Sequence, residues 1–219
     1  MGSDDVIGAW LARILRRRDG GTTDAQEAQP DRAVAIGGLG EALVAGRLRE
    51  VGWPILRNVI LRERGGSAEI DLLARSPAAL VVLEVKTWSG FIQGAAQAAI
   101  WVRHGGDGRE LSVPNAVRQN LAHVAAVERA IGDSGVSVWG IVVSAGHARF
   151  AAPLRPHVVP VSTLGEILQA QAMQARPADQ DRLDCAWTRL RQEAERSPGR
   201  REAHVAWLRS RDRAAENCE

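Results

Sequence analysis

Three charged side chains on two short apolar segments are the residues of this chain best suited to chemistry. Lys86 is the one lysine in the sequence, and it follows Glu84 by two positions at the end of an apolar run that begins at Leu80. Residues two apart on a β-strand point to the same face, so Glu84 and Lys86 share a face. Asp71 lies in the preceding apolar segment. The continuous apolar run indicates an interior strand, where an acid and a lysine without a partner would be costly to bury.

Carboxylates and a lysine at the ends of neighbouring strands suit phosphodiester hydrolysis. The reaction needs an activated water, charge neutralisation on the phosphate and help for the departing oxyanion, and Mg²⁺ or Mn²⁺ held by one or two carboxylates supplies these. We therefore predict that Asp71 and Glu84 bind the metal. Lys86 would hold the attacking water or stabilise charge on the phosphate. The alternative is a structural ion pair, because acid–apolar–lysine triplets also occur on exposed strands.

Polar residues elsewhere are further candidates for the same site. Glu41 follows a glycine-rich segment on a predicted helix, where glycines permit close approach or close packing. Glu69 lies two residues before Asp71 and shares its face, so it would complete an outer metal shell or orient the lysine. Gln119 lies on a later predicted helix and could donate to a phosphate or a base, although a lone glutamine on a helix is usually solvated.

Arginines near the predicted strands are weaker candidates for phosphate contacts. Most arginines around a sheet are solvated, so each is a weak signal by itself. The candidates beside the acidic strands and beside the glycine-rich turn at 105–108 are Arg57, Arg62, Arg64, Arg75, Arg103 and the neighbouring His104.

Composition indicates a globular protein with one domain of ordinary size plus appendages. The chain has 219 residues, 45% of them hydrophobic, and a formal net charge of +2, so nucleic-acid binding would need local basic patches. Cys185 and Cys218 lack zinc-ligand spacing and predict free thiols in a reducing cytoplasm. The absence of a long apolar stretch argues against a spanning helix, and the acidic start at Met1–Asp5 argues against a secretory signal.

Hydrophobic periodicity predicts an α/β domain with a mixed sheet flanked by helices. The helix expected from Pro114 or Asn115 to Ile131 should turn Val117, Leu121, Val124 and Val127 inward. A later helix should be capped by Ser162 or Thr163. The expected helices are Ala33–Glu50, Pro114–Ile131 and Leu164–Ala172, and the expected strands are Ile55–Leu61, Ser67–Ala74, Leu80–Lys86, Phe91–Gln93, Ala99–Val102, Glu110–Ser112, Val136–Ser144 and His157–Val161.

Three zones divide the chain. Residues 1–30 contain a basic amphipathic helix at Val6–Arg18 and a flexible linker, and this helix would lie on a membrane, on a partner or on the protein's own surface. Residues 31–172 form the main domain. Residues 173–219 form a charged helical extension, either an electrostatic contact for nucleic acid or a charged helix pair. Trp10, Trp187 and Trp207 suggest terminal helices that pack together or form a homodimer.

An ordered series of landmarks resembles the NERD (nuclease-related) domain family, which is assigned to the PD-(D/E)xK nuclease superfamily. The resemblance covers about residues 31–144. Its landmarks are Gly37-x-x-Gly40-Glu41, Glu69-Ile70-Asp71, Glu84-Val85-Lys86 with Gly90, Trp101, and Pro114-Asn115 with Gln119-Asn120.

The resemblance implies a restriction-endonuclease-like fold with extra N- and C-terminal helices in this chain. It implies metal binding by Asp71 and Glu84, support of the metal site by Glu41, catalysis by Lys86 and a helix-borne Gln119. The family often has Asn-Pro where this chain has Pro114-Asn115, which leaves the role of Asn115 open.

We predict a cytoplasmic, divalent-metal-dependent deoxyribonuclease, with DNA favoured over RNA by the resemblance. One alternative is a catalytically weak nuclease fold that binds DNA or protein. Another is a membrane-surface adaptor recruited by the N-terminal helix.

Overall fold

The structure is a computed structural model in which residues 28–175 and 177–216 are described. The predicted helix Val6–Arg18 and Cys218 lie outside these residues. Residues 36–219 form one compact unit, distinct from residues 1–35, and the description that follows concerns this unit. No helix within the described ranges is both long enough and apolar enough to cross a bilayer.

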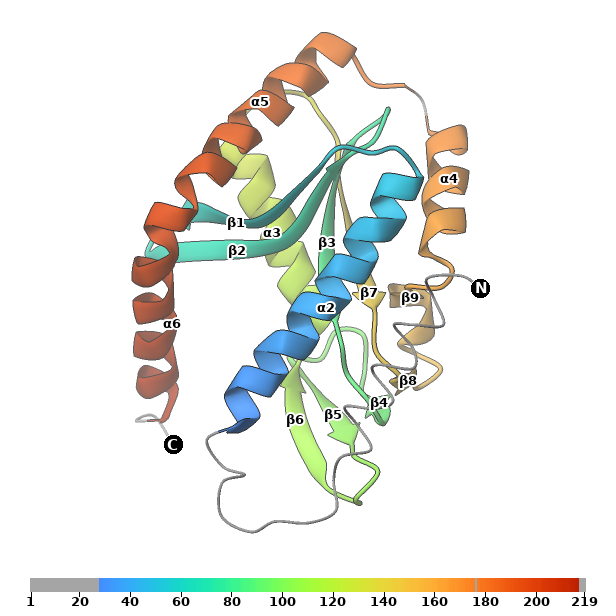
Figure 1. The fold of residues 1–219 in the computed structure, drawn as a ribbon, viewed down its shortest axis with the longest axis vertical. Coiled ribbons are helices and arrows are strands. Elements are labelled where there is room, and N and C mark those ends of the chain that lie inside the picture. The colour runs from blue at the N-terminus through green and yellow to red at the C-terminus, as the bar shows by residue number, and fades with distance from the viewer. Residues whose placement is uncertain (1–27, 176, 217–219) are drawn as a thin grey trace. The chain divides into compact units, whose positions relative to one another are not determined.

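A five-stranded mixed sheet forms the centre of the unit (Figure 1), with the strand order β1-β2-β3-β7-β9. β1, β2 and β3 are antiparallel neighbours, whereas β7 and β9 continue the sheet in parallel from β3. The mixed sheet flanked by helices is therefore confirmed. The strands are β1 (Ile55–Glu63), β2 (Gly66–Arg75), β3 (Leu80–Lys86), β7 (Val138–Ser144) and β9 (Val158–Pro160).

A second, smaller sheet has the order β6-β5-β4-β8. The first of its strands along the chain is β4, which follows closely after Lys86. Gly90 forms the turn before β4 with a left-handed φ of 86°, and a side chain there would also meet the carbonyl oxygen of His104. We expected its hairpin but not β8 or a separate sheet, because β8 has two residues and pairs with a strand distant in sequence. The strands are β4 (Phe91–Gln93), β5 (Ile100–His104), β6 (Glu110–Pro114) and β8 (Arg149–Phe150).

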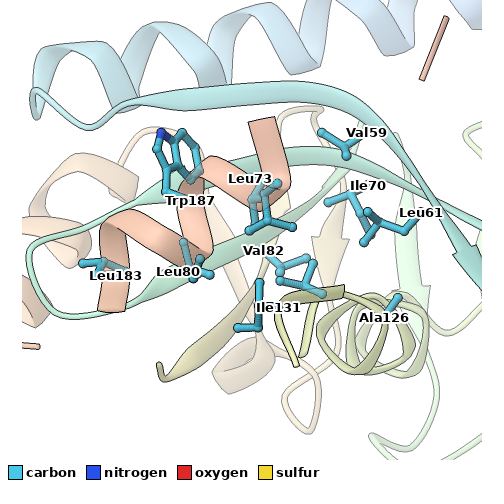
Figure 2. Close-up of a cluster of buried hydrophobic side chains, with 13 residues drawn as sticks. Val59, Leu61, Ile70, Leu73, Leu80, Val82, Ala126, Ile131, Leu183 and Trp187 are labelled. Atoms are coloured by element: carbon cyan, nitrogen blue, oxygen red, sulfur yellow. The ribbon is translucent and has the colours of Figure 1, made fainter. Parts of the chain in front are cut away.

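Helices cover both faces of the large sheet. α2 and α4 pack on one face, against side chains such as Leu72 and Leu83, whereas α3 and α5 pack on the other, against Leu73 and Val82. Figure 2 shows the buried apolar cluster between the sheet and the helices α3 and α5, with Ile131 of α3 and Trp187 of α5 packed on the sheet. Two covered faces explain the continuous apolar run of β3. The helices are α2 (Ala28–Glu50), α3 (Ala116–Ile131), α4 (Leu164–Gln174), α5 (Gln180–Arg196) and α6 (Arg201–Glu216), with 3₁₀ turns at Arg155–His157 and Pro198–Arg200.

α3 begins at an Asn115 cap. The Asn115 side chain accepts hydrogen bonds from the backbone N–H groups of Val117 and Arg118 at 2.9 and 3.2 Å, and it donates to the carbonyls of Ala96 and Ala98. Asn115 therefore ties the helix start to the loop before β5. This answers the question left by the reversed Pro114-Asn115 order, because the asparagine is a structural cap.

Two local predictions for the helices are confirmed only in part. Leu121 of α3 is 62% exposed, and the buried face of the helix carries Asn120 and His123 as well as apolar residues. Val127 is buried and Val124 packs against the same apolar cluster, as expected, so the prediction fails at Leu121 and misses the two polar residues. Thr163 holds the N-cap position of α4, as one of the two expected residues, but it makes no side-chain cap hydrogen bond.

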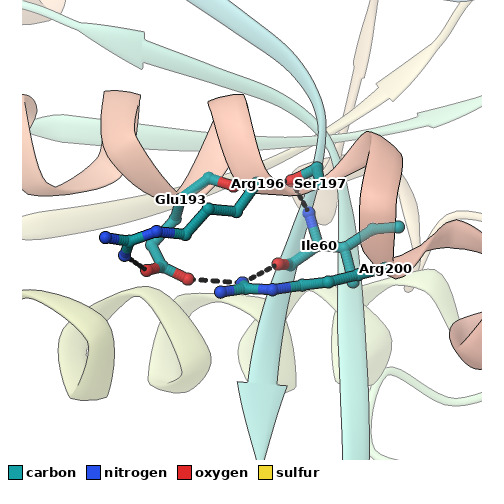
Figure 3. A network of polar contacts seen from close by, with 5 residues as sticks. All are labelled: Ile60, Glu193, Arg196, Ser197 and Arg200. Atoms are coloured by element: carbon teal, nitrogen blue, oxygen red, sulfur yellow. Dashed lines mark hydrogen bonds and ion pairs between the residues drawn. The ribbon is translucent and has the colours of Figure 1, made fainter.

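The junction of α5 and α6 is fixed to the outer edge of β1 (Figure 3). Ser197 Oγ accepts a hydrogen bond from the backbone N–H of Ile60 at 2.8 Å, and Arg200 donates to the carbonyl of the same residue at 2.8 Å. Glu193 pairs with both Arg196 and Arg200. Both backbone groups of Ile60, which an edge strand would leave unpaired, are thus satisfied, and the turn between the helices is held in place.

The two C-terminal helices belong to the same compact unit as the sheet. Trp187 packs in the core, and Trp207 of α6 donates from its indole N–H to the carbonyl of Gly65 at 2.7 Å. Both tryptophans therefore contact their own chain, while the homodimer and the domain boundary at residue 172 stay predictions. Cys185 is a free, exposed thiol, as predicted.

Candidate active site

Asp71 and Glu84 lie where β2 and β3 separate. The last paired residues of the β2–β3 ladder are Leu72 and Leu83, so Asp71 and Glu84 are the next opposed residues. Figure 1 shows β2 turning away from β3 beyond this point. The Asp71 carboxylate accepts a hydrogen bond from the backbone N–H of Val85 at 2.9 Å. The side chain of Asp71 thus replaces a strand partner and is held beside Glu84.

Lys86 is bound by two acceptors from different elements. Its Nζ lies 2.6 Å from Glu84 Oε1, and it donates to Gln119 Oε1 at 3.0 Å. It also lies 5.5 Å from the ring centre of Trp88, within the range of a cation–π contact. The Glu84 side chain is 1% exposed and the Lys86 side chain 19%. The buried acid therefore orients an ammonium group that keeps contact with solvent.

Asp71, Glu84, Lys86 and Gln119 form a polar cluster at the end of β3. His123 also belongs to this cluster, and the sequence analysis did not identify it. It lies one helical turn after Gln119, so both residues share the face of α3 that meets the end of β3. Its Nδ1 is 3.0 Å from Glu84 Oε2, but neither atom has a well-aligned hydrogen bond within the described part of the chain. The i, i+4 spacing of Gln119 and His123 was the signal that could have identified it.

The two central carboxyl groups have opposite pKa shifts. Burial, followed by the nearby Glu84 carboxylate, raises the pKa of Asp71 to about 7, and the hydrogen bond from Val85 and the Lys86 charge offset this only in part. Burial also acts to raise the pKa of Glu84, but His123 and Lys86 outweigh it and hold that pKa below its ordinary value. Glu84 is thus stabilised as the anion, whereas Asp71 has too little positive charge around it to offset its burial.

This donor set fits a hard divalent cation. Glu84 Oε2 is buried without a well-aligned hydrogen-bond donor. The negative charge of the neighbouring Asp71 is only partly offset by Val85 and Lys86. Magnesium favours oxygen ligands and is commonly held by one or two carboxylates while keeping several waters. Across the described residues, no group of three or more His, Cys, Asp or Glu side chains has a metal-binding arrangement. The fit therefore rests on two carboxylates.

Glu41 borders the cluster from α2. Its carboxylate lies 3.4 Å from Arg57, and burial raises its pKa although Arg57 acts in the opposite direction. Glu41 also contributes to raising the pKa of Asp71. Gly40 lets the helix approach this closely, because a Cβ there would lie 2.3 Å from Thr87 Cγ2. The glycine-rich segment thus has a packing function at Gly40.

Glu69 contacts α6 and not Lys86. Its two carboxylate oxygens lie 2.7 Å from Arg201 and 3.5 Å from the Nε2 atom of His204. Arg201 and His204 belong to a helix more than 130 positions away in sequence, so strand alternation alone could not have indicated them. The orientation of Lys86, which we had considered for Glu69, comes from Glu84 and Gln119.

An open cleft of about 830 Å³ leads to the cluster. Asp71, Gln119 and His123 line one part of it and α6 lines another, whereas Glu84 and Lys86 do not line it. Of the arginines proposed from the sequence, Arg64 lines this cleft. Arg62 and Arg103 are not among the lining residues, and Arg57 and Arg75 pair with Glu41 and Asp184. The arginines that line the cleft are Arg64, Arg118, Arg129 and Arg211.

Comparison with known proteins identifies one family. The family model described as nuclease-related domain matches residues 36–145, a segment that contains Glu41, Asp71, Glu84, Lys86 and Gln119. The match begins within α2 and ends one residue after β7, so α4, α5 and α6 lie outside it. No curated protein matches the chain.

Proposed function

Because the chain belongs to the nuclease-related domain family, we propose that it is a divalent-metal-dependent nuclease that hydrolyses phosphodiester bonds in DNA. The observation that carries this proposal is the position of Lys86. Its ammonium is held by Glu84 and Gln119, partly exposed, at the point where Asp71 and Glu84 meet. The family supports a nuclease-related function. Phosphodiester cleavage, the metal, the DNA substrate and the residue roles are our proposals.

Asp71 and Glu84 hold Mg²⁺ or Mn²⁺ in this proposal, and Glu41 supports the site from α2. The bound ion would supply an activated water and neutralise charge on the scissile phosphate. Two observations support these ligands: the Glu84 oxygen without an aligned donor, and the raised pKa of Asp71. A cation beside Asp71 would lower that pKa and so favour the ionised ligand.

Lys86 acts on the phosphate. In hydrolysis the water oxygen forms a bond to phosphorus while the bond from phosphorus to the leaving sugar oxygen breaks, and negative charge on the phosphate oxygens increases. The oriented ammonium of Lys86 stabilises that charge. Gln119 positions the lysine through its side-chain oxygen, which leaves the amide N–H groups to donate to the phosphate. His123 helps to keep Glu84 ionised.

The substrate is DNA in this proposal, and the cell compartment is the cytoplasm, where an exposed thiol such as Cys185 stays reduced. A module that binds nucleic acid without cutting it is the competing function. The two differ in a single respect, namely whether phosphodiester bonds break in the presence of the metal.

Cleavage of plasmid DNA and of a matched RNA, with Mg²⁺, with Mn²⁺ and with a chelator, tests this function. We expect metal-dependent cutting of DNA by the wild-type protein, with loss of about a hundredfold or more in Lys86→Ala and Asp71→Asn. Glu166→Gln, an exposed acid on α4, is the matched control and should cut like the wild type. Equal cutting by all four proteins would identify a contaminant and overturn the proposal, as would binding of DNA without metal-dependent cutting.

A further inference from the structure

α6 is docked beside the candidate active site by contacts along the first turns of the helix. Its start is fixed where Ser197 and Arg200 hold the edge of β1. One turn further on, His204 Nδ1 lies 2.7 Å from Ser67 Oγ of β2. The Trp207 indole then donates to Gly65 and lies so close to Gly66 that a Cβ there would be 2.1 Å from the ring.

The docked helix forms a wall of the cleft that leads to Asp71. The cleft is lined from α6 by His204, Trp207, Leu208 and Arg211, and from α3 by residues that include Arg118 and Gln119. The family match ends at residue 145, so this wall is supplied by a part of the chain outside the matched domain. Without α6 the cleft would be open on that side.

Three arginines line this cleft without an ion pair to any carboxylate of the described residues. Arg64 comes from the turn between β1 and β2, Arg118 from α3 and Arg211 from α6. A fourth, Arg129, is paired with Glu63 and is therefore neutralised. Unpaired guanidinium groups around an opening next to an anionic site create a local basic surface in a chain whose net charge is only +2.

The guanidinium of Arg211 is pre-organised. It lies 5.0 Å from the ring centre of Trp207, whose own orientation is fixed by its hydrogen bond to Gly65 and by contact with His204. A cation–π contact with an aromatic ring restrains the guanidinium and leaves its N–H groups available as donors. Phosphate oxygens are the acceptors that such a fork recognises best.

We propose that α6 completes the substrate groove of this protein and that Arg211, with Arg64 and Arg118, binds the phosphate backbone of one nucleic acid strand that leads to Asp71 and Lys86. This inference deepens the proposed nuclease function and rests on it. It assigns a binding role to the C-terminal extension, which the match to the nuclease-related domain does not reach.

The test is binding of a fluorescein-labelled single-stranded DNA oligonucleotide to the full chain in a chelator, at several salt concentrations. Arg211→Gln and Arg64→Gln should each weaken binding and make the slope of log K against log salt shallower by about 0.7, the value for one phosphate contact on a single strand. The matched controls are Arg209→Gln on the same helix and Arg149→Gln at an exposed position of β8, which remove the same charge outside the cleft. Both controls should keep the wild-type slope.

The outcomes separate this inference from the nuclease function, because binding in a chelator does not depend on cutting. Equal slopes for Arg211→Gln and Arg209→Gln would overturn the inference, and so would a wild-type protein that does not bind the oligonucleotide. Metal-dependent cutting could still be present in either case. Conversely, a shallower slope for Arg211→Gln with no cutting by the wild type would support the groove and reject the nuclease function. Circular dichroism of each variant confirms that the fold is retained.

Discussion

Gln119 on α3 accepts a hydrogen bond from Lys86 on β3 at 3.0 Å, and this contact joins the helix to the end of the central strand. Lys86 also pairs with Glu84 at 2.6 Å. Glu84 therefore holds the ammonium group, and the second hydrogen bond, to Gln119, fixes its orientation. This arrangement makes Gln119 a positioning residue, with a contribution separate from that of the lysine itself.

Replacement of Gln119 should therefore reduce DNA cleavage less than replacement of Lys86. A hydrogen bond with a charged donor contributes about 1.5–3 kcal/mol, so Gln119→Leu should slow cleavage by roughly tenfold to a hundredfold, with a smaller change in DNA affinity. Gln119→Glu should retain Lys86 in place and recover part of the rate. Gln169→Leu, at an exposed position of α4, serves as the control. Full activity of Gln119→Leu in initial-rate assays would contradict this role.

Metal affinity should depend on His123, which is 3.0 Å from the buried Glu84 oxygen. Loss of a group that orients and ionises a metal-binding carboxylate typically weakens affinity by about tenfold to a hundredfold. We expect this loss for His123→Ala when Mn²⁺ binding is measured by isothermal titration calorimetry. The exposed His147→Ala should bind Mn²⁺ like the wild type. Identical Mn²⁺ affinities for the two variants would exclude the role of His123.

Stability of the metal-free protein should fall as pH rises toward neutrality, because of Asp71. Its pKa is raised from 3.8 to about 7 on folding, so between these values the folded state binds more protons at this group than the unfolded state. The free energy of unfolding contributed by Asp71 therefore decreases with pH through this window and levels off above about 7. Urea denaturation in a chelator should show a flatter pH profile for Asp71→Asn than for the wild type. Parallel profiles between pH 5 and 7 would show that the Asp71 pKa is not raised.

Two glycines of α2 should respond to alanine with opposite signs. At Gly40 the added Cβ would lie 2.3 Å from Thr87 Cγ2, so the helix or the strand end must shift, and overpacking of this kind costs about 1–3 kcal/mol. At Gly46 nothing lies within 4 Å of the added Cβ, and alanine in a helix is favoured by roughly 0.5–1 kcal/mol. Urea midpoints should therefore fall for Gly40→Ala and rise for Gly46→Ala. A rise in both would mean that Gly40 does not mark a close contact.

The strands of the site could be predicted because their residues carry local information. The apolar run before Glu84 predicted β3 with the bounds the structure gives, Leu80–Lys86, and the period of two placed Glu84 and Lys86 on one face. The helices expected in the charged extension are also present, as α5 and α6 with a 3₁₀ turn at Pro198–Arg200 between them. β8 could not be predicted in this way. It has only two residues, and it forms a strand because it pairs with β4, which is distant in sequence.

The buried face of α3 shows where periodicity succeeded, at Val127, and where it failed within the site. Apolar spacing placed Leu121 inward, but Asn120 and His123 occupy the buried face. Polar groups can be buried when partners from another element receive them, and those partners, the carbonyl of Val82 and the carboxylate of Glu84, lie on β3. No local pattern in the helix could supply that information.

Strand alternation and an apolar run depend only on neighbouring residues, so the sequence was enough to indicate Asp71, Glu84 and Lys86 as candidates for chemistry. Their surroundings became visible only in the folded chain: His123 beside Glu84, Glu69 bound to α6, and Arg211 at the opening that leads to Asp71. Each of these contacts joins residues that are distant along the chain. Their positions depend on how helices pack on the sheet, because side-chain packing between elements has no short-range period in the sequence.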